Sequence, residues 1–172
     1  MIEPHHRRIA GMHVTKNGDI AIVWLSVEPV TGHIHIYDDA IFKAEVLAVI
    51  AEGINARGRW IPLSWSHEEI KNSLQERGCK TLPDPASSSD EMAEIVSRDL
   101  WERIRTKRIS VDKRLKDWLE EAQSLERTDG KIPKDSHPLM SATRIAMQNI
   151  KSAKRQQSRR VNRKEERRVA VI

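Results

Sequence analysis

The first forty residues constrain the fold most strongly, because they contain three segments with the pattern of β-strands. Residues 9–14 and 20–27 are apolar and rich in β-branched side chains, whereas residues 33–38 alternate with a period of two. An Asn-Gly pair at residues 17–18 and a segment with Pro and Gly at residues 29–32 separate the three. The pattern predicts an antiparallel meander.

After the meander the spacing of apolar residues becomes helical. Helices are predicted over residues 42–57, 68–77, 90–105, 115–125 and 139–150, with short strands over residues 61–65, 79–82 and 108–111. Strands that alternate with helices usually pair in parallel, so the chain is expected to be an α/β domain. Its mixed sheet would combine the antiparallel meander with parallel strands, flanked by helices. A length of 172 residues suits one domain, at residues 1–150, and a tail, at residues 151–172.

Positive charge is concentrated in this tail. The net charge of the chain is +5, yet residues 151–168 alone hold nine basic and two acidic residues, a net of +7. A concentrated basic segment binds phosphates without reading sequence, so double-stranded DNA is the expected partner. The expected DNA-binding residues are Arg144, Lys151, Lys154, Arg155, Arg159, Arg160, Arg163 and Lys164. The alternatives are a tail that only aids solubility and an Arg144 that only pairs with a nearby acid.

The sequence favours a cytoplasmic protein without a membrane segment. No apolar run approaches the roughly 18 residues that a membrane span needs, and the N-terminus lacks the pattern of a signal peptide. A single cysteine, Cys79, has no intramolecular partner for a disulfide. The five tryptophans lie within apolar runs, so we expect them in the core, with stacking on bases as the alternative.

Several short segments, in order along the chain, resemble one known family. They are Trp24–Asp38, Gly58–His67, Trp118–Glu121, Thr128–Ile132 and Leu139–Arg144. These segments look like the nuclease domain of large terminase subunits from headful-packaging tailed phages, and the resemblance covers residues 9–153. It implies an RNase H-like fold and a role in packaging viral or prophage-derived DNA, in the cytoplasm of a bacterial host or in association with virion assembly.

The resemblance also suggests partners. The sequence holds no Gly-x-x-x-x-Gly-Lys-Ser/Thr loop for ATP phosphates, so the ATPase motor of a terminase is not expected in it. A separate terminase ATPase, the portal or a small terminase subunit would be the protein partners.

The family's catalytic carboxylates are largely replaced. Such nucleases use acidic side chains to hold two divalent metal ions, which stabilise the attacking and leaving oxygens. The resemblance aligns the family's Gly-x-Asp with residues 11–13, so His13 stands in place of the first carboxylate. It places Glu68 after the fourth strand, where the second acid belongs. The Asp-Asp pair before the last helix becomes His137-Pro138, with Asp135 displaced from that position.

Two interpretations of these replacements stay open. In the first, which we adopt, the site has decayed and the chain is a pseudo-nuclease that binds DNA or assists assembly without a cofactor. In the second, His13, Glu68 and His137 hold Mn²⁺, Mg²⁺ or Zn²⁺, and Glu68 and Asp135 serve catalysis. A third function, protein interaction within a packaging or transfer particle, would make the tail necessary for assembly rather than for DNA affinity.

Other polar pairs are weaker candidates. His33 and His35 share one face of a predicted strand, where a structural role is expected before metal binding. Asp38 and Asp39 end that strand and are second-rank ligands.

Overall fold

A five-stranded mixed sheet forms the centre of the protein in a computed structural model that describes residues 2–43 and 45–157. Its strands are β1 (Arg7–Val14), β2 (Ile20–Val27), β3 (Ile34–Phe42), β4 (Leu63–Ser64) and β5 (Ile109–Val111). The order is β4-β1-β2-β3-β5, in which β1, β2 and β3 pair antiparallel. The two edge strands are parallel to their neighbours. The predicted α/β fold with a mixed, RNase H-like sheet is confirmed.

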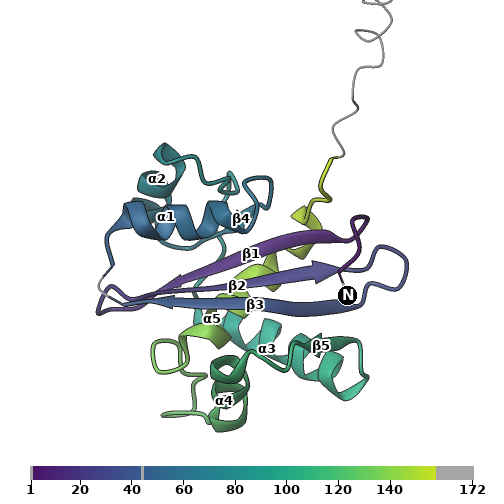
Figure 1. Ribbon diagram of the computed structural model, residues 1–172. Coiled ribbons are helices and arrows are strands. Elements are labelled where there is room, and N and C mark those ends of the chain that lie inside the picture. Colours follow the sequence, from purple (N-terminus) through teal and green to yellow (C-terminus); the bar gives the residue numbers. More distant parts are fainter. Residues whose placement is uncertain (1, 44, 158–172) are drawn as a thin grey trace, which may run out of the picture.

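Helices cover both faces of this sheet. They are α1 (Leu47–Ala56), α2 (Glu68–Glu76), α3 (Asp90–Arg105), α4 (Lys116–Ser124), α5 (Pro138–Gln148) and the short 3-10 helix η1 (Ile150–Ser152). Figure 1 shows α1 and α2 on one side of the sheet and α3 and α4 on the other. Alternate residues of the strands therefore enter two cores, one beneath α1 and α2 and one beneath α3, α4 and α5. Within the described residues, no helix is both long enough and apolar enough to cross a membrane.

Helix α5 lies directly on β1 because Gly11 has no side chain. A Cβ atom at this position would lie 2.2 Å from the carbonyl oxygen of Ala142 and 2.5 Å from the backbone nitrogen of Ala146. Every α5 residue from Leu139 to Met147 is buried. The close approach brings side chains of α5 against the end of β1, where the candidate site lies.

Two predicted helix boundaries and one predicted strand are wrong. Residue 42 still belongs to β3, paired with Ile20, so α1 begins five residues later than expected, at Leu47. Residues 79–82 do not form a strand and contribute one bridge, between Thr81 and Leu63. The last helix ends at Gln148 rather than continuing to residue 150.

The packed part of the chain continues past the predicted boundary at residue 150. Ala153 is buried, and Lys154 forms an antiparallel bridge with Arg8 at the start of β1. Two backbone hydrogen bonds make this bridge, from Arg8 N to Lys154 O at 2.7 Å and from Lys154 N to Arg8 O at 3.0 Å. Residues 151–154 therefore belong with the domain.

Candidate functional site

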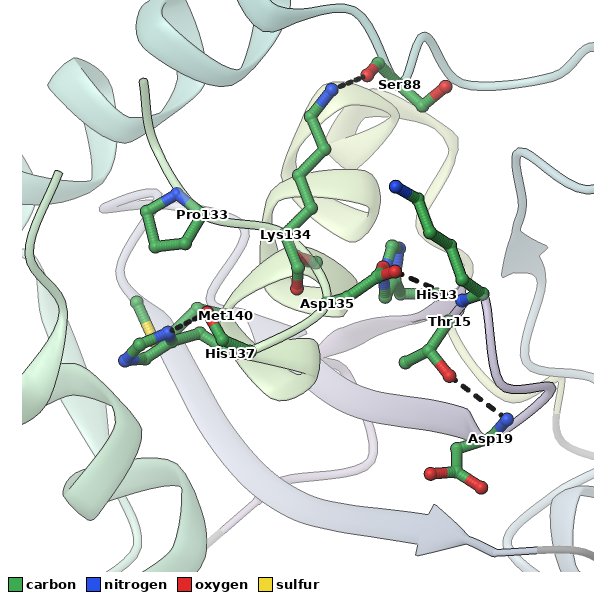
Figure 2. Close-up of polar contacts among 12 residues, drawn as sticks. His13, Thr15, Asp19, Ser88, Pro133, Lys134, Asp135, His137 and Met140 are labelled. Carbon is green, nitrogen blue, oxygen red and sulfur yellow. Dashed lines mark hydrogen bonds and ion pairs between the residues drawn. The ribbon is translucent and has the colours of Figure 1, made fainter. Parts of the chain in front are cut away.

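His13 and Asp135 meet at the end of β1, beside the start of α5. The His13 Nε2 atom lies 2.9 Å from Asp135 Oδ1, and Lys16 N donates a hydrogen bond to Asp135 Oδ2 at 3.1 Å. Figure 2 shows the two side chains pointing toward one another. His13 is almost fully buried, with 7% of the residue's surface exposed. The structure thus brings together two of the predicted site residues.

Burial makes this pair a hydrogen bond rather than a strong ion pair. Burial lowers the pKa of His13 below its ordinary value, although the Asp135 carboxylate acts in the opposite direction. The pKa of Asp135 is lowered as well, because the Lys16 N–H and His13 outweigh the effect of partial burial. At neutral pH the imidazole is therefore neutral and donates its Nε2–H to the carboxylate.

The other two predicted metal ligands lie apart from this pair. His137 bonds Ser124 Oγ through Nε2 at 3.1 Å and Ser136 Oγ through Nδ1 at 2.9 Å. In Figure 2 its ring lies next to Met140, away from His13. Glu68 is the exposed first residue of α2. Across residues 2–43 and 45–157, no hydrogen bond or ion pair joins either residue to His13.

The predicted set of three ligands is therefore not assembled into a compact group. In the described part of the chain, three potential ligand atoms come within 4.8 Å of one another only at His5, His6 and Glu28. The Glu28 carboxylate already accepts hydrogen bonds from Thr31 N and Thr31 Oγ1, both at 2.6 Å.

Arg144 projects from α5 into the space next to His13 and is buried, with 4% of its surface exposed. Its Nη2 atom donates to Pro133 O at 3.2 Å and to Ser141 Oγ at 3.0 Å, both neutral oxygens. Its Nη1 atom is buried and has no hydrogen-bond partner among the described residues. Burial lowers the pKa of Arg144 to about 10 even though Glu121 acts to raise it, so the guanidinium stays charged at neutral pH.

Lys134 and a serine loop cover this guanidinium. The Lys134 ammonium contacts the Ser88 carbonyl oxygen, as Figure 2 shows, and lies 2.9 Å from Asp90 Oδ1. Gln148 of α5 holds the loop by accepting from Ser87 N at 2.9 Å and donating to Ser87 O at 2.8 Å. His13, Lys134, Arg144 and serines 87–89 line a cavity of about 30 Å³, which we name the Arg144 cavity.

Asp135 also lines a larger, acidic cleft of about 630 Å³. The carboxylates in its walls are Asp19, Asp117, Glu120, Glu121 and Asp135. Glu121 caps α5, because it accepts hydrogen bonds from Leu139 N at 2.9 Å and Met140 N at 3.3 Å.

The Glu121 carboxyl titrates far from its ordinary range. Burial raises its pKa from 4.5 to about 7, and the negative charges of Asp39 and Asp117 act in the same direction. No sequence pattern predicts a role for Glu121. Its place in the Trp118–Glu121 segment was the available signal, but a capping role depends on the distant start of α5.

A basic groove lies at the other end of β1. The groove encloses about 860 Å³ and is lined by Pro4, Trp60, Lys80, Lys154, Arg155, Gln156 and Gln157, so three of these described residues are cationic and none is acidic. The Arg8 guanidinium lies 5.4 Å from the ring centre of Trp60 and 5.5 Å from that of Tyr37. The groove thus contains two of the predicted DNA-binding residues, Lys154 and Arg155.

The remaining predicted DNA-binding residues are distributed differently. Arg144 is buried, and Lys151 is exposed in η1. Arg159, Arg160, Arg163 and Lys164 lie outside the described residues. The tryptophan prediction is correct for Trp24, Trp65 and Trp118, which are buried. It is wrong for Trp101, which is 41% exposed, whereas Trp60 is partly buried and packs against the core beneath α1 and α2 while it also lines the groove.

Three of the four second-rank candidates are occupied by local contacts, whereas the Oδ2 atom of the fourth, Asp39, is buried without a hydrogen-bond partner among the described residues. His33 Nε2 and His35 Nδ1 both bond the Ser110 hydroxyl, at 2.9 and 2.8 Å, and so link β3 to β5. Asp38 accepts a 2.6 Å hydrogen bond from Arg57 Nε.

Solved structures of phage terminases have the same fold. The large terminase nuclease domain of P22 matches with a TM-score of 0.81 at 19% identity, over 90% of this chain and 87% of that one. The nuclease domain of bacteriophage SPP1 with bound Mn matches with a TM-score of 0.65 at 18% identity, over 84% and 86%. The nuclease of the thermophilic phage G20c with bound zinc matches with a TM-score of 0.63 at 16% identity, over 85% and 82%.

A longer large terminase, from another thermophilic bacteriophage, matches with a TM-score of 0.66 at 12% identity. The match covers 87% of this chain but 41% of that one. No protein-family model and no curated protein matches the sequence. The chain thus has the fold of terminase nuclease domains, as its resemblance to them predicted.

Proposed function

We propose that this chain is a terminase nuclease-like domain that binds duplex DNA during the packaging of a viral or prophage-derived genome, without cleaving it. One observation carries the absence of cleavage. His13 stands where the family resemblance expects the first metal-binding carboxylate, and this imidazole is buried and engaged by Asp135 at 2.9 Å. A neutral imidazole bonded to a carboxylate is poorly suited to replace a hard oxygen ligand of Mg²⁺.

DNA binding is supported by the basic groove and by the sequence that follows it. Lys80, Lys154 and Arg155 line an open groove whose described walls hold no acidic residue, and the basic segment continues from Arg155 along the chain. Exposed cations that neutralise phosphates release condensed counterions, which drives binding without base-specific contacts. The proposed ligand is therefore the backbone of duplex DNA rather than a particular sequence.

The proposed protein partners are inferred from the match of this chain to one part of a longer large terminase. The chain spans about two fifths of the longer large terminase that it matches, and its sequence contains no phosphate-binding loop for ATP. We propose that it works with a terminase ATPase, the portal or a small terminase subunit, in the cytoplasm of the bacterial host.

A metal-dependent endonuclease is the second candidate, and the acidic cleft favours it. The cleft gathers four carboxylates next to the His13–Asp135 pair, and carboxylate oxygens suit Mg²⁺ and Mn²⁺. Solved nucleases of this fold carry cobalt, zinc or Mn. In this alternative, a rearrangement would have to bring His13, Glu68 and His137 together or recruit the acids of the cleft.

Incubation of supercoiled plasmid with Mg²⁺, Mn²⁺ or Zn²⁺ separates the two candidates. The wild type should leave the plasmid intact with each metal, while a labelled duplex should bind with an affinity that falls steeply as salt rises. Metal-dependent nicking that disappears in both His13→Ala and Glu68→Ala, but persists in the neighbouring Glu69→Ala, would replace the first candidate by the second. Absence of duplex binding at low salt would refute the DNA-binding proposal itself.

A further inference from the structure

The buried guanidinium of Arg144 lacks a full set of hydrogen-bond acceptors. Only 4% of the residue is exposed, and its Nη1 atom has no partner in the part of the chain that the structure describes. An unsatisfied donor on a buried charged group is costly, because water no longer solvates it and no protein atom replaces the water. The two acceptors that the guanidinium does have are neutral, the Pro133 carbonyl and the Ser141 hydroxyl. An acceptor from outside the chain would complete the arrangement.

The walls of the Arg144 cavity suit an oxyanion. Lys134 adds a second cation, and the exposed serines 87–89 place hydroxyl and backbone groups at the rim. No acidic residue among the described residues lines the cavity, and two acids close to its walls are paired. Asp90 lies within 3.2 Å of the ammonium groups of both Lys131 and Lys134, and Asp135 bonds His13 and Lys16 N. A volume of about 30 Å³ has room for one or two atoms of the size of oxygen.

We propose that the Arg144 cavity binds one oxygen of a phosphate group, with Arg144 Nη1 as the buried donor and Lys134 as the second cation. The phosphorus and the other oxygens would remain at the serine rim. Guanidinium donors form short, charge-assisted hydrogen bonds with phosphate oxygens. The source of the phosphate, the DNA backbone rather than the free ion, rests on the proposed function.

The position of the cavity suggests how the proposed phosphate contact would act on DNA. The cavity lies beside His13, at the end of β1 where the family resemblance expects a metal-binding carboxylate. Metal ions in such a site would hold the scissile phosphate. Here the Arg144 guanidinium would hold a phosphate directly. The DNA strand would then be bound, but no metal ion would activate a water molecule to attack the phosphate.

Calorimetric titration tests the proposal. The full chain is titrated with inorganic phosphate and separately with a short blunt duplex, and variants of two neighbouring lysines are compared. Lys131 and Lys134 both contact Asp90, but Lys134 alone of the two lines the cavity. Lys134→Met should weaken phosphate binding about tenfold, the effect of one hydrogen bond to a charged group, whereas Lys131→Met should stay within about twofold of wild type. Arg144→Gln should abolish phosphate binding, with its fold checked by circular dichroism. If Arg144→Gln fails to fold, the comparison of Lys134→Met with Lys131→Met still tests the proposal.

The outcomes separate this inference from the proposed function. No phosphate binding by the wild type, or equal losses in the two lysine variants, would overturn the cavity as a phosphate site. If the duplex then still binds with a steep salt dependence, the proposed DNA-binding function holds although the cavity is not a phosphate site. If phosphate binds with the expected lysine difference but the duplex does not bind, the cavity takes free phosphate and DNA binding fails.

Discussion

The two ends of β1 present positive charge in opposite ways. At the start of the strand, Lys80, Lys154 and Arg155 are exposed around an open groove of about 860 Å³. At its end, Arg144 is buried beside a cavity of about 30 Å³, whose described walls hold no acidic residue.

This difference predicts two kinds of anion binding. Exposed charges act through a field that salt screens, so they hold a polyanion without a fixed geometry. A buried guanidinium acts through directed hydrogen bonds, which salt weakens much less. The proposed roles differ accordingly: the start of β1 would attract the DNA backbone, and the end of β1 would hold a single phosphate in place.

The largest effect is expected where α5 and β1 touch, since α5 carries Arg144 and leads to Lys154. Gly11→Ala would place a Cβ atom 2.2 Å from the carbonyl oxygen of Ala142. The helix must move, so the free energy of unfolding measured in urea should fall by more than about 3 kcal/mol. Gly18→Ala is the control, because Gly18 has open space around it and only a positive φ of 83°, which costs about 1–2 kcal/mol. Equal losses would mean that α5 can move away from β1 at little cost.

Removal of charge from the basic groove should affect DNA binding next most strongly. Lys80→Ala combined with Arg155→Ala should lower duplex affinity about tenfold and reduce the slope of log K against log salt by about 1.8, for two lost phosphate contacts. Lys113→Ala combined with Lys116→Ala removes equal charge from exposed positions outside the groove and serves as the control. Similar losses in both variants would show that net charge, and not the groove, determines binding.

A partly buried carboxyl, Glu121, also lies near the end of β1, so this end confines an acidic group as well as the Arg144 guanidinium. Its pKa is raised from 4.5 to about 7, so the folded state holds a proton that the unfolded state releases, and stability should fall as pH rises through this window. Glu121→Gln keeps an oxygen for Leu139 N and should be more stable than wild type at pH ~8, on the order of 1 kcal/mol after solvent screening. Glu120→Gln, in the same cleft, is the control in thermal unfolding at several pH values. A destabilised Glu121→Gln would show that the charged carboxylate is the better cap.

The smallest effect concerns the His13 pair. Asp135→Asn removes the carboxylate that counteracts burial, so the pKa of His13 should fall further below its ordinary value. A titration of the imidazole resonances by NMR measures this shift directly, with the exposed Asp129→Asn as the control. An unchanged or higher pKa would mean that Asp135 does not control the protonation of His13. Stability should change by less than about 1 kcal/mol.

Regular periodicity explains which parts of the fold could be predicted from the sequence. The apolar spacing of residues 90–105 marks a helix at the bounds that the structure has, and the meander follows the alternation of its strands. A strand was predicted wrongly at residues 79–82 because a short apolar segment has the same pattern whether or not it pairs with a neighbouring strand. Residue 42 was assigned to a helix because its pairing with Ile20 is not encoded locally.

The candidate site was harder to predict because its parts are distant in sequence. Only the family resemblance places His13 and Asp135 in one candidate site, because they are 122 residues apart and local patterns do not report contacts at that range. The Arg144 cavity depends on how the serine loop and Lys134 fold over α5, which no spacing in the sequence reveals. The prediction of His137 and Glu68 as metal ligands rests on the family resemblance, which carries no information on how their side chains point.

The backbone bridge between Arg8 and Lys154 also protects the protein from self-association. β4 pairs with β1 only at Ala10 and Gly11, so the first residues of β1 would present a free strand edge without Lys154. Free edges are templates on which a second chain adds a strand, which leads to aggregation. A protein shortened to the predicted boundary at residue 150 would lose this cover together with the buried Ala153. The residues that begin the basic tail therefore help to keep the domain from pairing with copies of itself.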